Sequence, residues 1–207
     1  MNRDNNSVWV RSVLRNGAAS RGHTKLRLRF EVLLCVLFGI SNLWADQPKP
    51  NEYQVEAVYL LNFAKFVEWP ATALPPESTF NICVLGQYPF GAALERTIAG
   101  ESIDGHKVLV QRISRPQDAT GCRILFISLS EETRLPEILK ILYKSSVLTV
   151  SNVPKFSQQG GMIQFVTEAN KVRFEVNLSS AERAGLTLSS ELLKVATSVT
   201  RNGQIGN

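Results

Sequence analysis

The stretch that decides the fold is Gly-Gly-Met-Ile-Gln-Phe-Val (160–166), followed closely by Asn-Lys-Val-Arg-Phe-Glu-Val-Asn-Leu (170–178). Over Val172–Leu178, apolar residues occupy every second position, a period that is typical of a half-exposed antiparallel strand. The apolar run Met162–Thr167 precedes it, and Ala169-Asn170 stands between the two as a corner. The sequence therefore predicts a β-hairpin near the C-terminus.

Before the hairpin, strand-like and helix-like segments alternate along the chain. Asn51 and Gln54 form a variant of the capping box, which predicts a helix that begins there and ends near Val67, before Pro70. Further strands are expected at 81–86, 107–113, 123–128 and 147–153, the last buried on both faces. Further helices are expected at 89–99, from a Ser128/Glu131 capping box through Lys144, from Ser179 (with Glu182 as its cap partner) to Gly185, and from 189 to about 200. This order predicts an α/β sandwich, mostly parallel with an antiparallel edge.

The first of these helices is apolar on most of its sides. One face, at spacings of three and four, consists of Val55, Tyr59, Phe63 and Phe66. A second apolar face holds Leu60, Leu61 and Ala64, and the polar remainder is Glu52, Glu56, Asn62 and Lys65. A helix of this composition is buried between layers or against another chain.

Residues 1–45 have the composition of a secretory signal peptide. Basic residues are frequent up to Arg29, an apolar run extends from Val32 to Ile40, and Leu43-Trp44-Ala45 provides a cleavage site. The nine-residue apolar run is too short to span a bilayer, which needs about 20 residues. We expect a Sec-type leader cleaved near Ala45, export, and a single domain over 46–207. A retained membrane anchor is the alternative.

The leader also accounts for the basic character of the chain. It holds seven of the 23 Lys and Arg residues and two of the 18 Asp and Glu residues, which leaves 16 of each sign in the remainder. The mature chain is neutral, so the sequence pI of about 9.3 gives no support for nucleic-acid or anionic-membrane binding.

Cysteine use agrees with export. Cys35 would leave with the leader, and Cys83 and Cys122 remain, each inside or beside a strand-like run. In an exported protein an even pair predicts a disulfide, with two buried free thiols as the alternative.

Reactive side chains are scarce in the mature chain. His106 is its one histidine and lies in a Gly-His-Lys turn, and Glu131-Glu132 are acids at a helix start, where they complement the helix dipole. We find no nucleophile elbow, Walker loop or zinc-protease motif in the sequence. We therefore expect no catalytic residues, no metal site, no cofactor and no enzymatic activity.

Glycines mark two places where the backbone could meet a ligand. Gly86 and Gly91 bracket a strand-to-helix turn whose amides could receive an anion, although an ordinary turn explains them as well. Gly160-Gly161 suits close backbone approach or positive φ ahead of the hairpin, or the lip of a groove. Arg173, on the polar face of the last strand, could meet an anionic ligand or remain solvated.

The hairpin segments, Ala184–Leu193, Tyr59–Pro70 (YLLNFAKFVEWP) and Ile82–Gly91 (ICVLGQYPFG) together resemble the YfiR family over roughly Tyr53 to Ala196. The resemblance implies a three-layer α/β/α sandwich, similar to half of a periplasmic solute-binding protein, with a disulfide between Cys83 and Cys122. It also implies a periplasmic location and frequent homodimerisation. A second cysteine pair of the family is missing here, since 150–154 reads Val-Ser-Asn-Val-Pro.

The same resemblance implies a function. YfiR-type proteins bind the periplasmic sensor region of an inner-membrane diguanylate cyclase and inhibit it, which lowers cyclic-di-GMP and biofilm formation, and an outer-membrane lipoprotein sequesters them. Candidate partner-binding residues, each of which core packing would explain equally, are Phe63, Phe66, Trp69, Phe165, Val172, Phe174, Val176 and Leu178. The alternative function is a small-ligand sensor or solute-binding module for a transporter or histidine kinase, with its pocket near Gly86–Gly91 and Ser128–Ser130.

Overall fold

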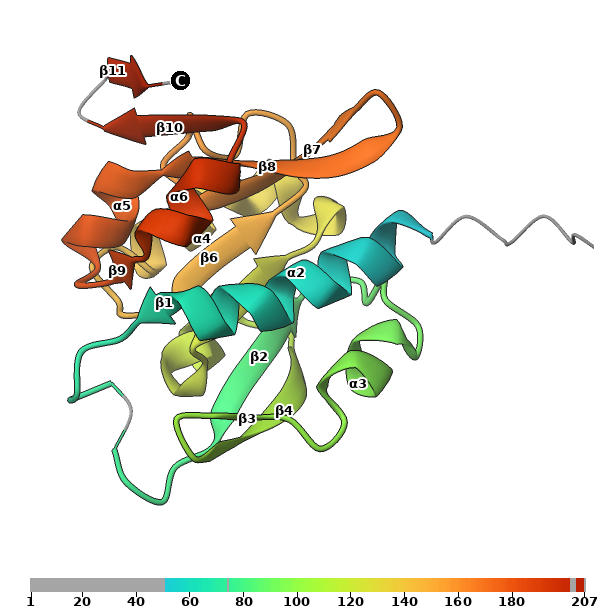
Figure 1. The fold of residues 1–207 in the computed structure, drawn as a ribbon, viewed down its shortest axis with the longest axis vertical. Helices are drawn as coiled ribbons and strands as arrows, with labels where there is room; N and C mark the ends of the chain where they lie inside the picture. Colours follow the sequence, from blue (N-terminus) through green and yellow to red (C-terminus); the bar gives the residue numbers. More distant parts are fainter. Residues whose placement is uncertain (1–50, 74, 202–203, 207) are drawn as a thin grey trace, which may run out of the picture. The chain divides into compact units, whose positions relative to one another are not determined.

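One nine-stranded mixed sheet forms the centre of the described chain (Figure 1). The structure, a computed structural model, describes residues 51–73, 75–201 and 204–206. The chain divides into the units Met1–Lys49 and Pro50–Asn207, and all described residues belong to the second. The expected leader and its cleavage near Ala45 therefore lie outside the described residues. Among those residues, no helix has the length and apolar character needed to cross a membrane.

The sheet is mostly parallel, as predicted. Its strand order is β11-β10-β8-β7-β6-β5-β2-β4-β3. The bounds are β2 Phe80–Leu85, β3 Ser102–Ile103, β4 His106–Ile113, β5 Ile124–Ile127, β6 Leu148–Ser151, β7 Ile163–Glu168, β8 Lys171–Asn177, β10 Ser198–Arg201 and β11 Gln204–Gly206. Strands β4, β2, β5, β6 and β7 pair in parallel, whereas β7 and β8 are antiparallel. A separate two-stranded piece joins β1 (Val67–Glu68) to β9 (Thr187–Leu188).

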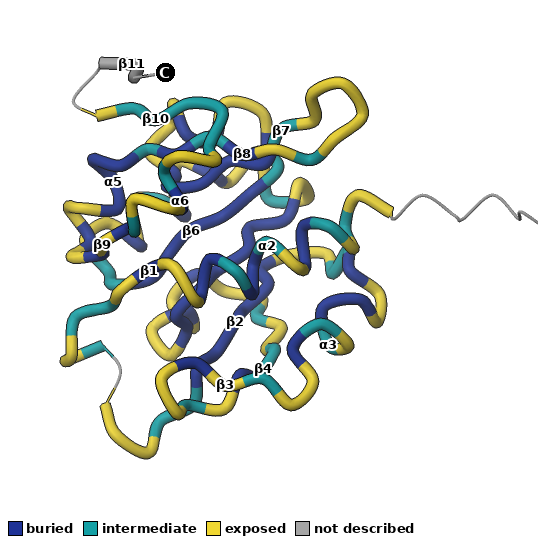
Figure 2. The backbone as a smooth tube through the Cα atoms, viewed as in Figure 1, coloured by how far each residue is buried: buried dark blue, intermediate teal, exposed yellow. Residues whose placement is uncertain are grey.

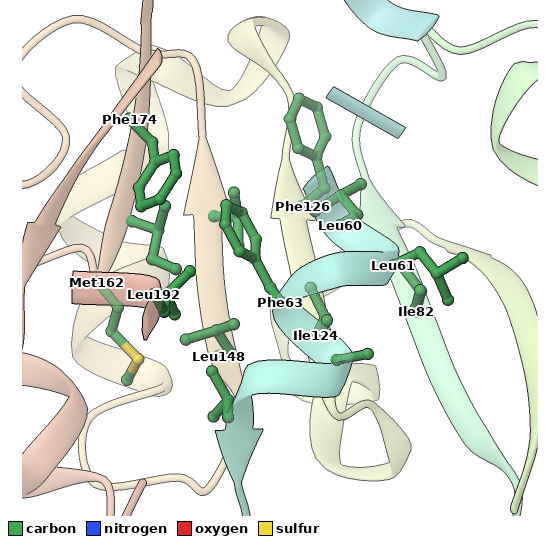
Figure 3. Close-up of a cluster of buried hydrophobic side chains, with 14 of the residues drawn as sticks. Leu60, Leu61, Phe63, Ile82, Ile124, Phe126, Leu148, Met162, Phe174 and Leu192 are labelled. Carbon is green, nitrogen blue, oxygen red and sulfur yellow. The ribbon is translucent and has the colours of Figure 1, made fainter. Parts of the chain in front are cut away.

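Helices cover both faces of the sheet and create a core on each. On one face, α2 (Glu52–Phe66), α3 (Ala93–Ile98) and α6 (Ser190–Val195) contribute to the larger apolar cluster (Figure 3). On the other face, the 3-10 helix η1 (Pro116–Gly121) and α4 (Leu135–Ile141) pack on a smaller cluster. The helix α5 (Leu178–Arg183) follows the hairpin. The inner strands are buried throughout, as Figure 2 shows. The α/β fold class is therefore confirmed.

The helix α2 begins and ends where the sequence predicts. Asn51 Oδ1 accepts a hydrogen bond from the Tyr53 amide at 3.2 Å, and Gln54 Oε1 accepts one from the Asn51 amide at 3.1 Å. These bonds satisfy donors that a helix start would otherwise leave free. The helix ends at Phe66, and Val67 is extended, which lets β1 form before Pro70.

The hairpin of β7 and β8 is also confirmed. Phe165 lies opposite Phe174, and the chain reverses at Ala169 and Asn170, whose φ angles are 48° and 60°. Two successive residues at positive φ match the right-handed twist of a two-residue hairpin. Leu178 was expected in the second strand but is the first residue of α5.

Several predicted helix boundaries were wrong for local reasons. The helix expected at 89–99 is α3, over 93–98, because Gly91 has φ +56 and a right-handed helix cannot continue through it. The helix expected from Ser128 splits into the 3-10 helix η2 (Leu129–Arg134) and α4, because Pro136 lacks an amide donor and disfavours the preceding α-helical turn. Ser128 makes no side-chain capping bond.

The C-terminal segment differs most from prediction. Asn177, rather than Ser179, caps α5, since Asn177 Oδ1 accepts from the Ser180 amide at 3.0 Å. The last helix, α6, ends at Val195, and β10 follows where the helix was expected to continue. β-branched residues at 197, 199 and 200 favour an extended backbone, and the Thr197 amide bonds the Phe174 carbonyl at 2.9 Å.

Cys83 of β2 and Cys122, ahead of β5, form a disulfide with their Cα atoms 5.8 Å apart. This pairing confirms the prediction from the even cysteine count and from the YfiR resemblance. It links two adjacent parallel strands on the face that α4 covers.

Candidate functional site: the outer surface of α2

The two groups of residues predicted to bind a partner meet each other. Phe63 of α2 stacks on Phe165 with ring centres 5.8 Å apart and meets Phe174 edge-on at 5.1 Å. Tyr59 contacts Phe165 and Phe174 too, and its hydroxyl donates to the Val172 carbonyl at 3.5 Å. The structure therefore brings the helix and the hairpin together, but as halves of one core (Figure 3).

Burial separates these eight candidate residues into three groups. Five of them are buried in the core and present no surface to a partner in this structure: Phe63, Phe165, Phe174, Val176 and Leu178. Trp69 and Val172 are half-buried, and Trp69 packs edge-on against Phe80 while its indole N–H donates to the Arg123 carbonyl at 3.2 Å. Phe66 alone among the eight is exposed, at 41%.

The exposed apolar residues of α2 form a stripe, which we call the α2 surface. It consists of the exposed Val58 and Phe66 together with the half-buried Val55 and the polar, half-buried Asn62 between them, all within about 80° of the helix circumference at about 100° per residue. Val58 is 48% exposed, and sequence analysis did not select it. Beside Phe66 begins α6, whose Ser189 amide donates to the Phe66 carbonyl at 2.9 Å and whose Val195 is 59% exposed. This surface can bury apolar area against another protein.

The residues proposed for an anion are not brought together. Gly86 directly follows β2, whereas Arg173 lies on β8, with β5, β6 and β7 between the two strands. At Gly86 an added Cβ would lie 2.5 Å from Ser130 Oγ, and the Gln87 amide donates to that hydroxyl at 2.9 Å. Gly86 thus lets the turn close on Ser130, at the sheet edge where the alternative function would place a ligand pocket.

Gly161 has a packing role. The ring of Phe156 lies so close to its Cα that an added Cβ would overlap ring carbons. Phe156 belongs to the smaller cluster, so the glycine lets the loop before the hairpin pack onto that core. Bonds from Ser157 to Gln164 and Glu175 hold the same loop at 3.0 to 3.1 Å.

Sequence analysis placed Glu56 among the polar remainder of α2, but the structure buries it completely, at 0% exposure. Asn152, just after β6, donates from Nδ2 to Glu56 Oε1 at 3.4 Å. Burial, and secondarily the negative charge of Glu52, raise the pKa of Glu56 to about 8, against the opposing hydrogen bond from Asn152. The only sequence signal was its position in a helix apolar on most sides.

The described residues offer little for catalysis. His106 begins β4, and its Nδ1 lies 2.8 Å from the Ser78 carbonyl rather than facing solvent in an open turn. No group of three or more His, Cys, Asp or Glu side chains in the described ranges could hold a metal ion.

The family described as YfiR/HmsC-like matches residues 53–197, well over half of the chain. The chain belongs to this family. YfiR/HmsC-like proteins are regulatory and non-catalytic, and membership suggests a role in regulating cyclic-di-GMP signalling.

A solved structure is also similar. It is a conserved domain protein from Vibrio cholerae O1 biovar El Tor, 14% identical, with a TM-score of 0.48. The match covers 72% of this chain and 60% of that one, so this chain spans about three fifths of that protein.

Proposed function

We propose that this protein is a periplasmic regulator that binds the periplasmic region of an inner-membrane diguanylate cyclase and holds it inactive. Lower cyclic-di-GMP and less biofilm would follow. The observation that carries the proposal is the YfiR/HmsC-like match over 53–197. The disulfide between Cys83 and Cys122 supports an oxidising compartment. An outer-membrane lipoprotein would release the cyclase by sequestering the regulator, and the regulator would act as a homodimer.

We assign the cyclase contact to the α2 surface. Val58 and Phe66 are large apolar side chains held at 48% and 41% exposure on a helix whose other faces are fixed in the core. A rigid helix loses little conformational entropy when it binds, which leaves more of the interaction energy as affinity. At the end of this stripe, Lys65 pairs with Glu101 at 3.1 Å and gives it a polar border.

Inhibition requires only a modest energetic bias. A regulator shifts a cyclase toward its inactive conformation by binding that conformation more tightly than the active one. A 100-fold shift corresponds to about 2.7 kcal/mol of differential affinity. Two apolar side chains buried at the centre of an interface can provide that amount, at about 2 kcal/mol each.

The test combines a deletion with surface variants. Deleting the gene should raise cyclic-di-GMP and biofilm formation, and expressing the wild-type protein should reverse both. The double variant Val58→Asp, Phe66→Asp should fold, as judged by circular dichroism, yet fail to capture the cyclase from membranes or to restore repression. Aspartate introduces a charge that would have to be desolvated at the interface.

A matched control is available on the opposite side of the sheet. Ile141 and Tyr143, at the end of α4, are exposed like Val58 and Phe66, so Ile141→Asp, Tyr143→Asp should leave repression intact. If this variant loses repression while the α2 variant keeps it, the surface assignment is wrong. Unchanged cyclic-di-GMP after deletion would contradict the regulator itself, and capture of a permease or kinase instead of a cyclase would favour the sensor alternative.

A further inference from the structure

A buried polar contact joins Glu56 of α2 to Asn152, the residue after β6. Glu56 and Asn152 share one hydrogen bond, from Asn152 Nδ2 to Glu56 Oε1 at 3.4 Å. The other oxygen of each side chain, Glu56 Oε2 and Asn152 Oδ1, is buried and has no hydrogen-bond partner. Leaving two such atoms unsatisfied is costly in a folded core.

A proton on Glu56 would resolve this. A carboxylate and an amide oxygen are both acceptors, so they cannot satisfy each other. Protonated Glu56 would carry an O–H on Oε2, and Asn152 Oδ1 is an unsatisfied acceptor on the side chain that Glu56 Oε1 already contacts. The acid and the amide would then exchange two hydrogen bonds, N–H to C=O and O–H to C=O.

No positive charge nearby favours the ionised form. On α2 itself, Glu52 lies one turn earlier and its negative charge acts on Glu56. Side chains alternate between the two faces of β7 and β8, and Phe165 and Phe174 are on the face that packs against α2. Glu175 is on the opposite face, where it accepts a hydrogen bond from Ser157. The remaining charged groups on neighbouring elements are exposed or paired, except Arg123, which is buried just before β5, at the end of the parallel strands opposite Asn152. The paired groups are Glu95 with Arg112, Lys65 with Glu101, and Glu131 with Arg134. The exposed groups are Arg96, Lys155, Glu168, Lys171, Arg173, Glu191 and Lys194.

We propose that Glu56 and Asn152 form a proton-dependent lock that holds the first two turns of α2 against the end of β6. While the proton is bound, Oε2 donates to Asn152 Oδ1 and the turn around Glu56 stays dry. When the proton leaves, the carboxylate needs water, and water reaches it only if Ala57 and Leu60, both 0% exposed, move away from the sheet. Loss of the proton therefore loosens the start of α2. That loosening of α2 would weaken a partner's contact with Val58 rests on the proposed function, whereas the lock itself does not.

The sign of the pH dependence follows from linkage. Burial raises the pKa of Glu56 from its ordinary 4.5 to about 8, so between these values the folded protein holds a proton that the unfolded chain lacks. The stabilisation is complete below pH 4.5 and is lost as the pH rises through about 8. Within this window, the folding equilibrium constant falls about tenfold per pH unit because of this one group.

The experiment compares wild type with Glu56→Gln in urea denaturation from pH 5.5 to 7.5. Glutamine keeps the shape and supplies an N–H donor toward Asn152 Oδ1 without a titrating proton. The ratio of the wild-type to the variant folding constant should fall about 100-fold over these two units. Amide hydrogen exchange at 55–60 should also accelerate with pH more in wild type than in the variant. Taking the ratio at each pH removes the intrinsic base catalysis.

Glu52→Gln is the matched control, because Glu52 is an exposed carboxyl on the same helix. This variant should keep the downward slope at the lower end of the pH range, with its upper limit moved to lower pH because the charge of Glu52 contributes to the raised pKa of Glu56. The carboxyl carbon-13 chemical shift of Glu56 in wild type gives a direct readout and should titrate near pH 8. This measurement tests the lock even if Glu56→Gln does not fold. Equal pH dependence of wild type and Glu56→Gln, or a carbon-13 midpoint near 4.5, would overturn the lock. Loss of cyclase binding with an intact lock would count against the proposed function alone.

Discussion

The two faces of the central sheet are covered by different means. On one face the 15-residue α2 spans the sheet and packs aromatic side chains against the hairpin. On the other, the coverage consists of 3-10 turns and the seven-residue α4, and its cluster contains the disulfide of Cys83 and Cys122. Short helices bury less apolar area, so the covalent bond lies on the face that noncovalent packing stabilises less. The α2 face, in turn, is free to present an outer surface.

The largest effect should come from the aromatic cluster on the α2 face. Phe63→Ala should lower the free energy of unfolding by about 5 kcal/mol, because it removes a fully buried ring with three aromatic partners. Urea denaturation measures the loss. Phe66→Ala, on the same helix but exposed, should change stability by about 0.5 kcal/mol or less. Similar losses in the two variants would remove the distinction between the inner and outer sides of α2.

Removing the disulfide should have the next largest effect, confined to the other face. In chains that begin at Asp46, Cys83→Ala with Cys122→Ala should cost roughly 4 kcal/mol, since the bond closes a 39-residue separation. Denaturant midpoints of the variant and of wild type give the difference. Denatured wild type should show no free thiol without reductant. A loss well below about 1 kcal/mol would mean that the α4 face is stable without its covalent link.

The smallest effect should arise where the loop before the hairpin packs on the smaller cluster. Gly161→Ala should cost about 1–3 kcal/mol because its Cβ overlaps the Phe156 ring. Phe156→Leu makes room for the methyl group, so the double variant should lose less than the sum of the single losses. A double-mutant cycle in urea measures this coupling. Additive losses would show that Gly161 acts through its backbone alone.

Local chemistry was sufficient to predict several elements. Asn51 and Gln54 carry the donors and acceptors of a helix start, and the period of two over Val172–Leu178 distinguishes a strand with one buried face. Even the disulfide could be predicted, because only two cysteines remain outside the expected leader. Gly91 and Pro136 also signal helix boundaries in the sequence, but the apolar periodicity on both sides of each residue predicts one continuous helix.

Other features depended on neighbours that are distant in sequence. The strand β10 exists because β8 offers it a parallel edge, at Ser198 beside Glu175. The residues predicted to bind a partner lie on both the buried and the exposed side of α2. Phe63 and Phe66 are three residues apart, yet Phe63 is in the core and Phe66 is exposed to solvent.

The sequence by itself therefore determined the periodic elements, their order and the family, because hydrogen-bonding caps and apolar periods act within a few residues. Only the tertiary structure decided which side of α2 is inside, and hence that Val58 is exposed while Glu56 is buried against Asn152. Burial is a property of what lies across from a side chain, and on a helix that is apolar nearly all round no local pattern specifies it.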